Sequence, residues 1–240
     1  MFRIEYFDTL DSTNTYLQSR KSEDEGLVIV AKSQTKGRGQ NNNQWISDTG
    51  GLYFSFLLKP PILSPTLSIM TGLVIIKTLE TFGIENLKLK WPNDILYNEA
   101  KISGILIESK VKGAVPDYII IGCGININQL TFSGVNEYIP TSMKIINNKS
   151  YDLNQVLNSF LEIFECYYQN YLSQKTECFI KEIQDLIYKK DQFVKIKLSD
   201  FILEGKIKAL NSDAALIVET KEGEKCIYSG RILKTRPHSI

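Results

Sequence analysis

The chain has 240 residues, of which 43% are hydrophobic and 23% charged, as in soluble globular proteins and unlike disordered or collagen-like chains. This length allows one large domain, or one large and one small domain. Lysine and arginine total 28 against 27 acidic residues, so the chain lacks the basic excess that binding a long nucleic acid normally requires. We therefore expect an autonomously folding protein that does not bind nucleic acid.

The sequence gives no sign of a secretion signal or of a membrane span. The N-terminal residues alternate polar and apolar, and the longest apolar runs are far shorter than the roughly 20 residues that cross a bilayer. The four cysteines are far apart in the sequence and the chain has only one histidine, which argues against a zinc site. We expect a cytoplasmic protein with reduced thiols and no membrane partner.

The first part of the chain alternates predicted strands and helices. After a strand over residues 1–6, the polar run DSTN at residues 11–14 begins a helix that we expect Gly26 to end. Residues 67–82 have apolar positions at helical intervals and stop at Gly83, which indicates a second, buried helix. The strands that we expect to share one sheet cover residues 27–31, 51–58, 87–91, 102–108 and 118–127, with a polar turn at residues 93–94.

The last part of the chain changes from helical to strand periodicity. Residues 151–189 are aromatic-rich with a helical period and a break near residues 172–176, so we predict two helices. Short alternating strands follow at residues 193–198, 202–209, 214–219 and 225–228. They predict a small β-barrel of about 50 residues. We therefore expect a domain over residues 1–189 and a second over residues 190–240.

A loop rich in glycine and amide side chains follows the strand at residues 27–31. Residues 37–45, GRGQNNNQW, place Arg38 between two glycines and end on Trp45. Glycine lets a backbone approach an anion closely, and arginine pairs with carboxylate or phosphate. Taken alone, the segment also fits an ordinary solvated loop.

Residues 90–94, KWPND, set a cation, a flat aromatic, a rigid turn and a carboxylate side by side. An aspartate at the end of a strand can hold magnesium, and a nearby lysine can neutralise phosphate oxygens during adenylyl transfer. A surface turn with an incidental ion pair explains the segment at least as well when it is taken in isolation.

Two neighbouring predicted strands contain glycines at interior positions. Gly104 follows Lys101 on one strand, and Gly122 and Gly124 lie on the next. Glycine weakens a strand, so it often marks a place where a ligand or another backbone comes close. Facing strands without side chains would leave a slot for a flat or narrow ligand, although tight packing also explains single glycines.

Together and in order, these segments resemble the catalytic module of biotin protein ligases. The matching motifs are DSTN at 11–14, GRG at 37–39 with the following Trp, KWPND at 90–94, KxxGILxE at 101–108 and GxGIN at 122–126. The resemblance covers essentially the whole chain. It implies an α+β fold, in which a central mixed β-sheet is flanked by helices as in class II aminoacyl-tRNA synthetases and lipoate ligases, with a small C-terminal SH3-like β-barrel.

The resemblance also implies roles for the matching residues. The implied biotin-binding residues are Ser12, Thr13, Asn14, Gln34, Gly37, Arg38, Gly39, Lys101, Gly104, Gly122 and Gly124. The implied ATP-binding residues are Arg38, Gln40, Trp45, Lys90, Asn93, Asp94, Lys101 and Asn126. The implied catalytic residues are Lys101, Arg38, Lys90 and Asp94, and Asp94 would also hold Mg²⁺.

The activity implied is that of an ATP-dependent ligase that forms biotinyl-5′-AMP and transfers biotin to a lysine of a biotin carboxyl carrier protein. Because the carboxylate of biotin and the triphosphate of ATP repel each other, the site must supply positive charge where they meet. The DSTN run already starts at Asp11, so we expect the monofunctional form without the DNA-binding domain of some relatives. A free sheet edge would allow a homodimer.

Two other functions stay open at this point. A lipoate or octanoate ligase would use the same fold to activate another carboxylic acid, but KWPND, KxxGIL and the predicted barrel favour biotin. A non-catalytic sensor of biotin or nucleotide would keep the pocket alone. The presence of Lys90, Lys101 and Asp94 argues against the sensor.

Overall fold

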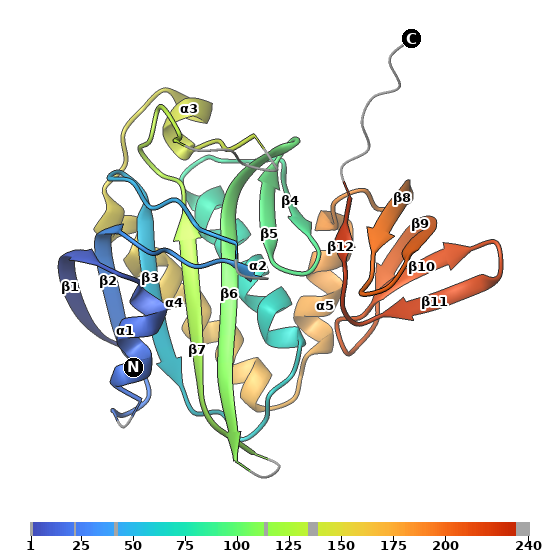
Figure 1. Ribbon diagram of the computed structural model, residues 1–240, viewed down its shortest axis with the longest axis horizontal. Coiled ribbons are helices and arrows are strands. Elements are labelled where there is room, and N and C mark those ends of the chain that lie inside the picture. Colours follow the sequence, from blue (N-terminus) through green and yellow to red (C-terminus); the bar gives the residue numbers. More distant parts are fainter. Residues whose placement is uncertain (1, 22, 41–42, 113–114, 134–138, 234–240) are drawn as a thin grey trace.

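The computed structural model describes residues 2–21, 23–40, 43–112, 115–133 and 139–233. Its strands form a seven-stranded sheet in the order β1-β2-β3-β7-β6-β5-β4 and a separate five-stranded sheet, as Figure 1 shows. The seven strands are β1 (Arg3–Leu10), β2 (Leu27–Gln34), β3 (Leu52–Leu58), β4 (Leu87–Lys90), β5 (Asp94–Tyr97), β6 (Ala100–Lys112) and β7 (Val115–Ile125).

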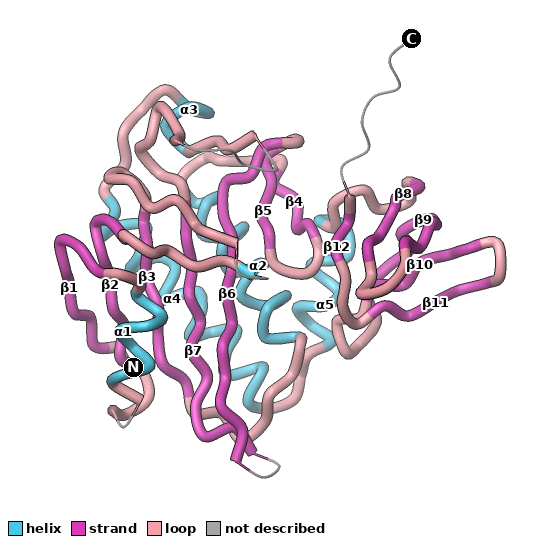
Figure 2. Tube along the Cα trace, viewed as in Figure 1, coloured by secondary structure: helices cyan, strands magenta, loops and turns pink. Residues whose placement is uncertain are grey.

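The larger sheet is mixed and carries helices on both faces. Strands β1 and β2 run parallel, and the other neighbouring pairs are antiparallel, which confirms the predicted α+β class with a central mixed sheet. Helices α2 (Thr66–Thr81), α4 (Leu153–Leu172) and α5 (Glu177–Ile183) lie behind the sheet in Figure 2, and the short helix α1 (Thr13–Ser19) lies in front of it.

Alternation along the strands divides the apolar residues between the two faces. Phe54 and Phe56 of β3 face the helices, where their rings pack against Phe160 of α4 within the main core. Leu57 faces α1 and joins a much smaller cluster that includes Leu17. Because the main core uses only one face of the sheet, most of the other face is left for polar groups.

The hairpin of β4 and β5 corrects the predicted turn at Asn93-Asp94. The turn covers residues 91–93, and Asp94 is the first residue of a strand that the sequence analysis missed. In the hairpin Asp94 pairs directly with Lys90 of β4. The strand was missed because it is only four residues long and begins with a charged residue.

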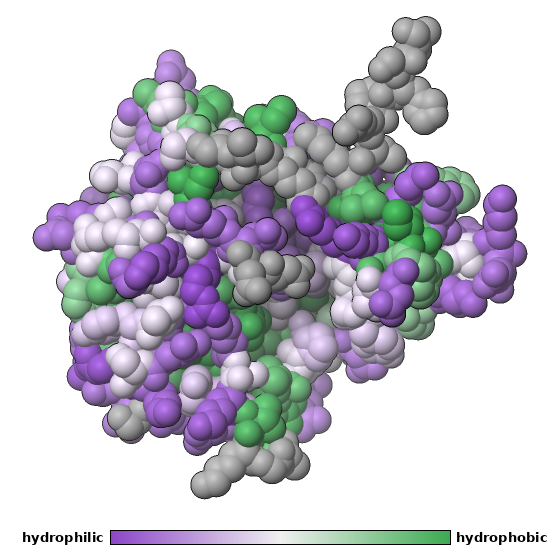
Figure 3. Space-filling view, viewed as in Figure 1, coloured by the Kyte–Doolittle hydropathy of each residue, from purple (hydrophilic) through white to green (hydrophobic). Residues whose placement is uncertain are grey.

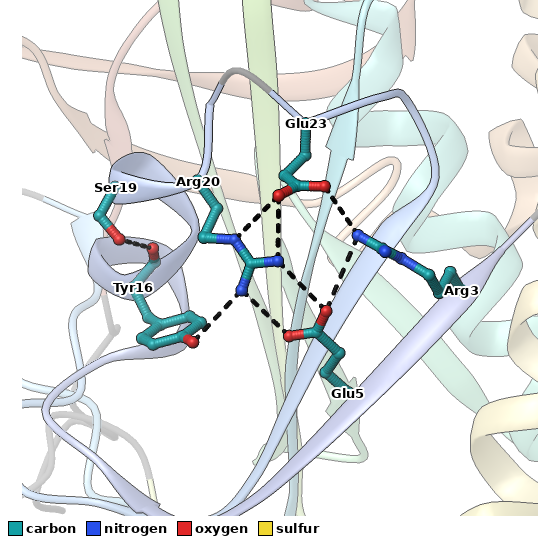
Figure 4. Close-up of polar contacts among 6 residues, drawn as sticks. All are labelled: Arg3, Glu5, Tyr16, Ser19, Arg20 and Glu23. Carbon is teal, nitrogen blue, oxygen red and sulfur yellow. Dashed lines mark hydrogen bonds and ion pairs between the residues drawn. The ribbon is translucent and has the colours of Figure 1, made fainter.

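Helix α1 is shorter than predicted and is anchored by charged side chains. It ends at Ser19, well before Gly26, which has a positive φ of 94° in the turn that leads to β2. Arg20 follows the helix, and its guanidinium group lies 3.2 Å from a carboxylate oxygen of Glu5 and 3.1 Å from one of Glu23, as drawn in Figure 4. This network ties the C-terminal end of α1 to β1.

The five-stranded sheet has the order β11-β10-β9-β8-β12 and confirms the predicted C-terminal β-unit. Among the described strand pairs, β11 and β12 are the two ends, and no pairing joins them into a closed barrel. This sheet contacts the β4–β5 hairpin, because Trp91 Nε1 donates a hydrogen bond to the Ala214 carbonyl over 3.0 Å. Its strands are β8 (Phe193–Lys197), β9 (Ile202–Leu210), β10 (Leu216–Thr220), β11 (Gly223–Ile227) and β12 (Arg231–Ile232).

The helices of residues 139–189 test one prediction. The predicted pair of helices in residues 151–189 is confirmed as α4 and α5, and a short helix α3 (Met143–Asn147) was not predicted. None of the described helices is both long and apolar enough to cross a membrane.

Candidate active site

A pocket opens on the face of the sheet that carries α1, between the helix, the loop at residues 37–45 and strands β5 to β7. In the space-filling view of this face, hydrophilic and weakly polar residues predominate over α1 and the loop (Figure 3). The predicted site residues that line the pocket are Ser12, Thr13, Asn14, Gln34, Arg38, Gly39, Gln40, Trp45, Asn93, Asp94, Lys101, Gly104, Gly122 and Gly124.

The glycines form the floor of the pocket, in the positions that the strand register dictates. Gly104 of β6 pairs with Gly124 of β7 on one side and with Asp94 of β5 on the other. A Cβ atom at Gly124 would lie 2.5 Å from Trp45 Nε1, and one at Gly104 would lie 2.9 Å from Trp45 Cζ3. The two strands therefore leave a flat slot, as the sequence predicted, beside the carboxylate of Asp94.

The indole ring of Trp45 fills this slot. Lys101 Nζ lies 5.0 Å from the ring centroid, a cation–π contact. Trp45 Nε1 is the one buried side-chain nitrogen or oxygen of the described residues that has no hydrogen-bond partner. A cavity volume of about 50 Å³ remains beside the ring, so a flat bicyclic ligand has to displace it.

The N-terminal end of α1 supplies buried hydroxyl and amide groups to one end of the pocket. Ser12 caps the helix by accepting a hydrogen bond from Thr15 N over 3.4 Å. Thr13 donates to Gln34 Oε1 from both its backbone nitrogen (2.8 Å) and its hydroxyl group (3.1 Å). The capping and ligand-binding readings of residues 12–14 are thus compatible, because Ser12 caps while its neighbours face the pocket.

Two polar residues that the sequence analysis did not assign join this group. Ser55 of β3 is fully buried, and its Oγ lies 2.6 Å from Thr13 Oγ1 and 2.5 Å from Asn14 Oδ1. Glu108 of β6 accepts hydrogen bonds from Asn14 Nδ2 over 2.8 Å and from Arg38 Nη2 over 2.5 Å. Ser55 had a usable signal, since it is the one small polar residue in the aliphatic and aromatic strand LYFSFLL.

The charged residues meet at the other end of the pocket. Lys101 Nζ lies 2.6 Å from Asp94 Oδ1, and Lys90 Nζ lies 3.7 Å from Asp94 Oδ2. Lys90 is only 4% exposed and lies behind Asp94, outside the pocket lining. The pKa of Lys90 is lowered to about 8, chiefly by burial and also by the nearby charges of Lys101 and Arg231, while Asp94 opposes the shift.

Besides Lys90, two predicted site residues, Asn126 and Gly37, lie outside the pocket lining. Asn126 is buried outside the lining, and its Nδ2 donates to the Lys101 carbonyl over 3.4 Å. Gly37 also lies outside the lining. A Cβ atom there would be 2.2 Å from the Trp45 carbonyl oxygen, so this glycine allows the backbone at residue 37 to lie close to the backbone at residue 45. Residues 41 and 42 of the predicted loop are outside the described residues.

The acidic groups of the pocket can bind a magnesium ion only if water and substrate phosphates supply most of its ligands. Asp94 is the carboxylate of the pocket lining, and the described residues contain no cluster of three or more metal-ligating side chains. Magnesium commonly binds through one or two carboxylates plus substrate phosphates and water. The donor set therefore suits an ion that arrives with a nucleotide.

Comparisons with known proteins agree with this geometry. Residues 6–126 match the model of the biotin/lipoate A/B protein ligase family. The bifunctional ligase/repressor BirA of Bacillus spizizenii is 29% identical over 235 residues, covering 95% of this chain and 72% of that protein. A biotin protein ligase of Aquifex aeolicus, solved with biotin and ATP, is 31% identical with a TM-score of 0.86, covering 97% of this chain and 98% of that one. The chain therefore belongs to the biotin/lipoate A/B protein ligase family.

Proposed function

We propose that this chain is an ATP-dependent biotin protein ligase, which activates biotin as biotinyl-5′-AMP and transfers it to a specific lysine of a biotin carboxyl carrier protein. The observation that carries the proposal is the meeting of Lys101 and Asp94 in one pocket that Arg38 also lines, with Lys90 behind. Similarity to a biotin protein ligase solved with biotin and ATP supports biotin and ATP as the substrates.

The first step brings two anions together, and the basic residues lower its barrier. Lys101 stands at the junction of the biotin carboxylate and the α-phosphate, where negative charge builds up as the carboxylate oxygen attacks phosphorus and pyrophosphate leaves. Arg38 binds the carboxylate and phosphate region from the loop side. Lys90 adds a buried positive charge next to Asp94, where the low exposure strengthens its field.

Asp94 and Asn93 would hold a magnesium ion that enters with ATP, and such an ion would neutralise phosphate charge. Asp94 also fixes the ammonium group of Lys101 through their 2.6 Å ion pair. In the second step the neutral carrier lysine attacks the carbonyl carbon of the anhydride, the bond to the phosphate oxygen breaks, AMP leaves, and the carboxylate of Asp94 takes the lysine proton.

The loop over the slot protects the intermediate from water. Biotinyl-5′-AMP is a mixed anhydride that water hydrolyses, so a closed site must exclude solvent until the carrier arrives. Trp45 already lies flat on Gly104 and Gly124. We assign to its ring the role of covering the bound ligand once biotin takes the slot.

The same proposal includes the finer organisation of the protein. Residues 1–189 form the biotin- and ATP-binding domain, and residues 190–240 form a small β-domain whose contact at Trp91 supports the β4–β5 hairpin. The protein acts in the cytoplasm, where its cysteines persist as free thiols. Strand β1 is an edge of the larger sheet and suits a homodimer contact.

Mass spectrometry of a biotin carboxyl carrier domain incubated with this protein, ATP, magnesium and biotin tests the function directly. We expect a mass increase equal to one biotinyl group on a single lysine, and no increase when ATP is left out. An unmodified carrier domain in the complete mixture would contradict the proposal.

Pyrophosphate release with different carboxylic acids distinguishes the biotin ligase from a lipoate or octanoate ligase and from a non-catalytic sensor. We expect pyrophosphate release with biotin and little with lipoate or octanoate at equal concentration. Faster release with lipoate or octanoate would favour the lipoate-type ligase. Tight binding of biotin without any pyrophosphate release would favour the sensor.

Lys90→Met should separate stability from activity. Lys90 carries a charge in a buried position, and its loss leaves Asp94 still paired with Lys101. Because an apolar side chain avoids the desolvation cost, we expect Tm to stay equal or rise. Pyrophosphate release should fall about tenfold or more, since one positive charge is missing beside the phosphates.

Thermal unfolding and pyrophosphate release measured on the same preparation check this expectation. Lys88→Met is the matched control, because Lys88 lies on the same strand and its Nζ donates to the Asp185 carbonyl, outside the pocket. Full activity in the Lys90 variant would remove this residue from the reaction.

A further inference from the structure

We propose that Glu108 is a positioning residue that couples the polar end of the biotin slot to the loop that carries Arg38. This inference rests on the proposed function, because it assigns the polar end of the slot to the ureido group of biotin. In the sequence Glu108 is only the last residue of the KxxGILxE motif, and neither the pocket lining nor the reaction described above uses it.

Glu108 ties two separate segments to the sheet with one carboxylate. Its side chain is 21% exposed and lies on β6, on the same face as Gly104. Oε2 accepts a hydrogen bond from Asn14 Nδ2 of α1 over 2.8 Å, and Oε1 forms an ion pair of 2.5 Å with Arg38 Nη2 of the loop. A shift at either partner therefore reaches the other through a single group.

The carboxylate also fixes the direction of the hydrogen bonds behind it. An ionised carboxylate only accepts, so the Asn14 amide must turn its Nδ2 toward Glu108 and its Oδ1 toward Ser55. Because Asn14 Oδ1 carries no proton, Ser55 donates to it over 2.5 Å. The hydroxyl proton of Thr13 is directed to Gln34 Oε1 over 3.1 Å.

This ordered chain suits one class of ligand group. With its proton directed into the protein, the Thr13 oxygen presents lone pairs to the slot, and such an acceptor pairs with an N–H of a urea. Gly122 is required beside the chain, because a Cβ atom there would lie 2.1 Å from Asn14 Oδ1. Glu108 lies outside the pocket lining, but through Asn14 and Ser55 it makes the Thr13 oxygen a hydrogen-bond acceptor at this end of the slot.

Glu108→Gln tests the inference with little change in size. Asn14 and Arg38 donate to different oxygens of Glu108, and in glutamine one of these oxygens becomes an NH₂ group that only donates, so one of the two hydrogen bonds is lost. We expect KM for biotin in pyrophosphate release to rise about tenfold to hundredfold, as for a lost hydrogen bond to a charged group, with kcat and KM for ATP changed less than about threefold. Asp117→Asn is the matched control, since it neutralises an exposed carboxylate on the neighbouring strand β7.

A second variant, Ser55→Ala, breaks the same chain without touching the charge. We expect it to raise KM for biotin in a similar way. In the double variant, KM for biotin should exceed that of the more impaired single variant by no more than about threefold, because both changes disrupt one chain of hydrogen bonds. Effects that multiply, or a Glu108→Gln variant with an unchanged KM for biotin, would overturn the inference. A Glu108→Gln variant in which kcat falls while the KM values for biotin and for ATP both rise would also overturn it.

The two proposals fail in different ways. If the wild-type protein releases no pyrophosphate with biotin, the proposed function is wrong, and calorimetry of biotin binding then tests Glu108 by itself. A tenfold or larger loss of biotin affinity in Glu108→Gln, but not in Asp117→Asn, would still support the coupling role. If wild-type activity is normal and affinity is unchanged in Glu108→Gln, only the inference fails.

Discussion

Lys101→Ala is expected to lower biotin-dependent pyrophosphate release by about a thousandfold while biotin affinity stays within about threefold of the wild type. The ammonium group lines the pocket 2.6 Å from Asp94 Oδ1, so it lies where the reacting carboxylate and phosphate would meet. Since the charge it neutralises develops mainly as the bond forms, its loss should appear in kcat and much less in binding.

Single-turnover pyrophosphate release and biotin calorimetry measure the two quantities separately. Lys110→Ala is the matched control, because Lys110 lies exposed on the same strand, β6, outside the pocket. Lys101→Arg keeps the charge but changes its geometry, and we expect it to recover only part of the rate. A Lys101→Ala variant that adenylates biotin at the wild-type rate would refute the mechanism.

Gly124→Val should abolish measurable biotin binding, an expected loss of at least about a hundredfold, with the fold retained. The new side chain would enter the slot, since a Cβ atom there already lies 2.5 Å from the indole of Trp45. Valine suits a strand, and it would face the pocket and not the main core, so we expect cooperative unfolding to persist.

Biotin calorimetry and thermal unfolding of the same variant check this result. Ile121→Val is the control, because Ile121 lies on the same strand in the main core and its truncation costs about 0.5–1.5 kcal/mol of stability without entering the slot. If Gly124→Val binds biotin as the wild type does, the floor of the pocket is not the biotin site.

The sequence was sufficient to predict the elements that carry a strong period. The two aromatic helices, the long buried helix at Thr66–Thr81 and most strands lie where periodicity indicated, and the paired glycines do form a flat slot. These predictions succeeded because burial of a repeating apolar face depends mainly on local spacing.

The remaining features depend on which residues meet across the sheet. Strand β5 is short and begins with Asp94, whose pairing with Lys90 follows from hairpin register and not from composition. Ser55 and Glu108 gained partners from α1 and the loop, which are remote in the chain. Such contacts arise from tertiary packing between remote segments. Local sequence patterns therefore do not predict which of these side chains meet.

The hydrogen bond from Trp91 to the Ala214 carbonyl has a practical consequence for anyone who wishes to shorten this protein. Arg231 of β12 in the same smaller sheet lies near the buried Lys90, and its positive charge helps to lower the pKa of that lysine. A truncated protein lacking β12 would lose this positive charge beside Lys90. A shortened labelling reagent based on this chain should therefore keep the C-terminal sheet.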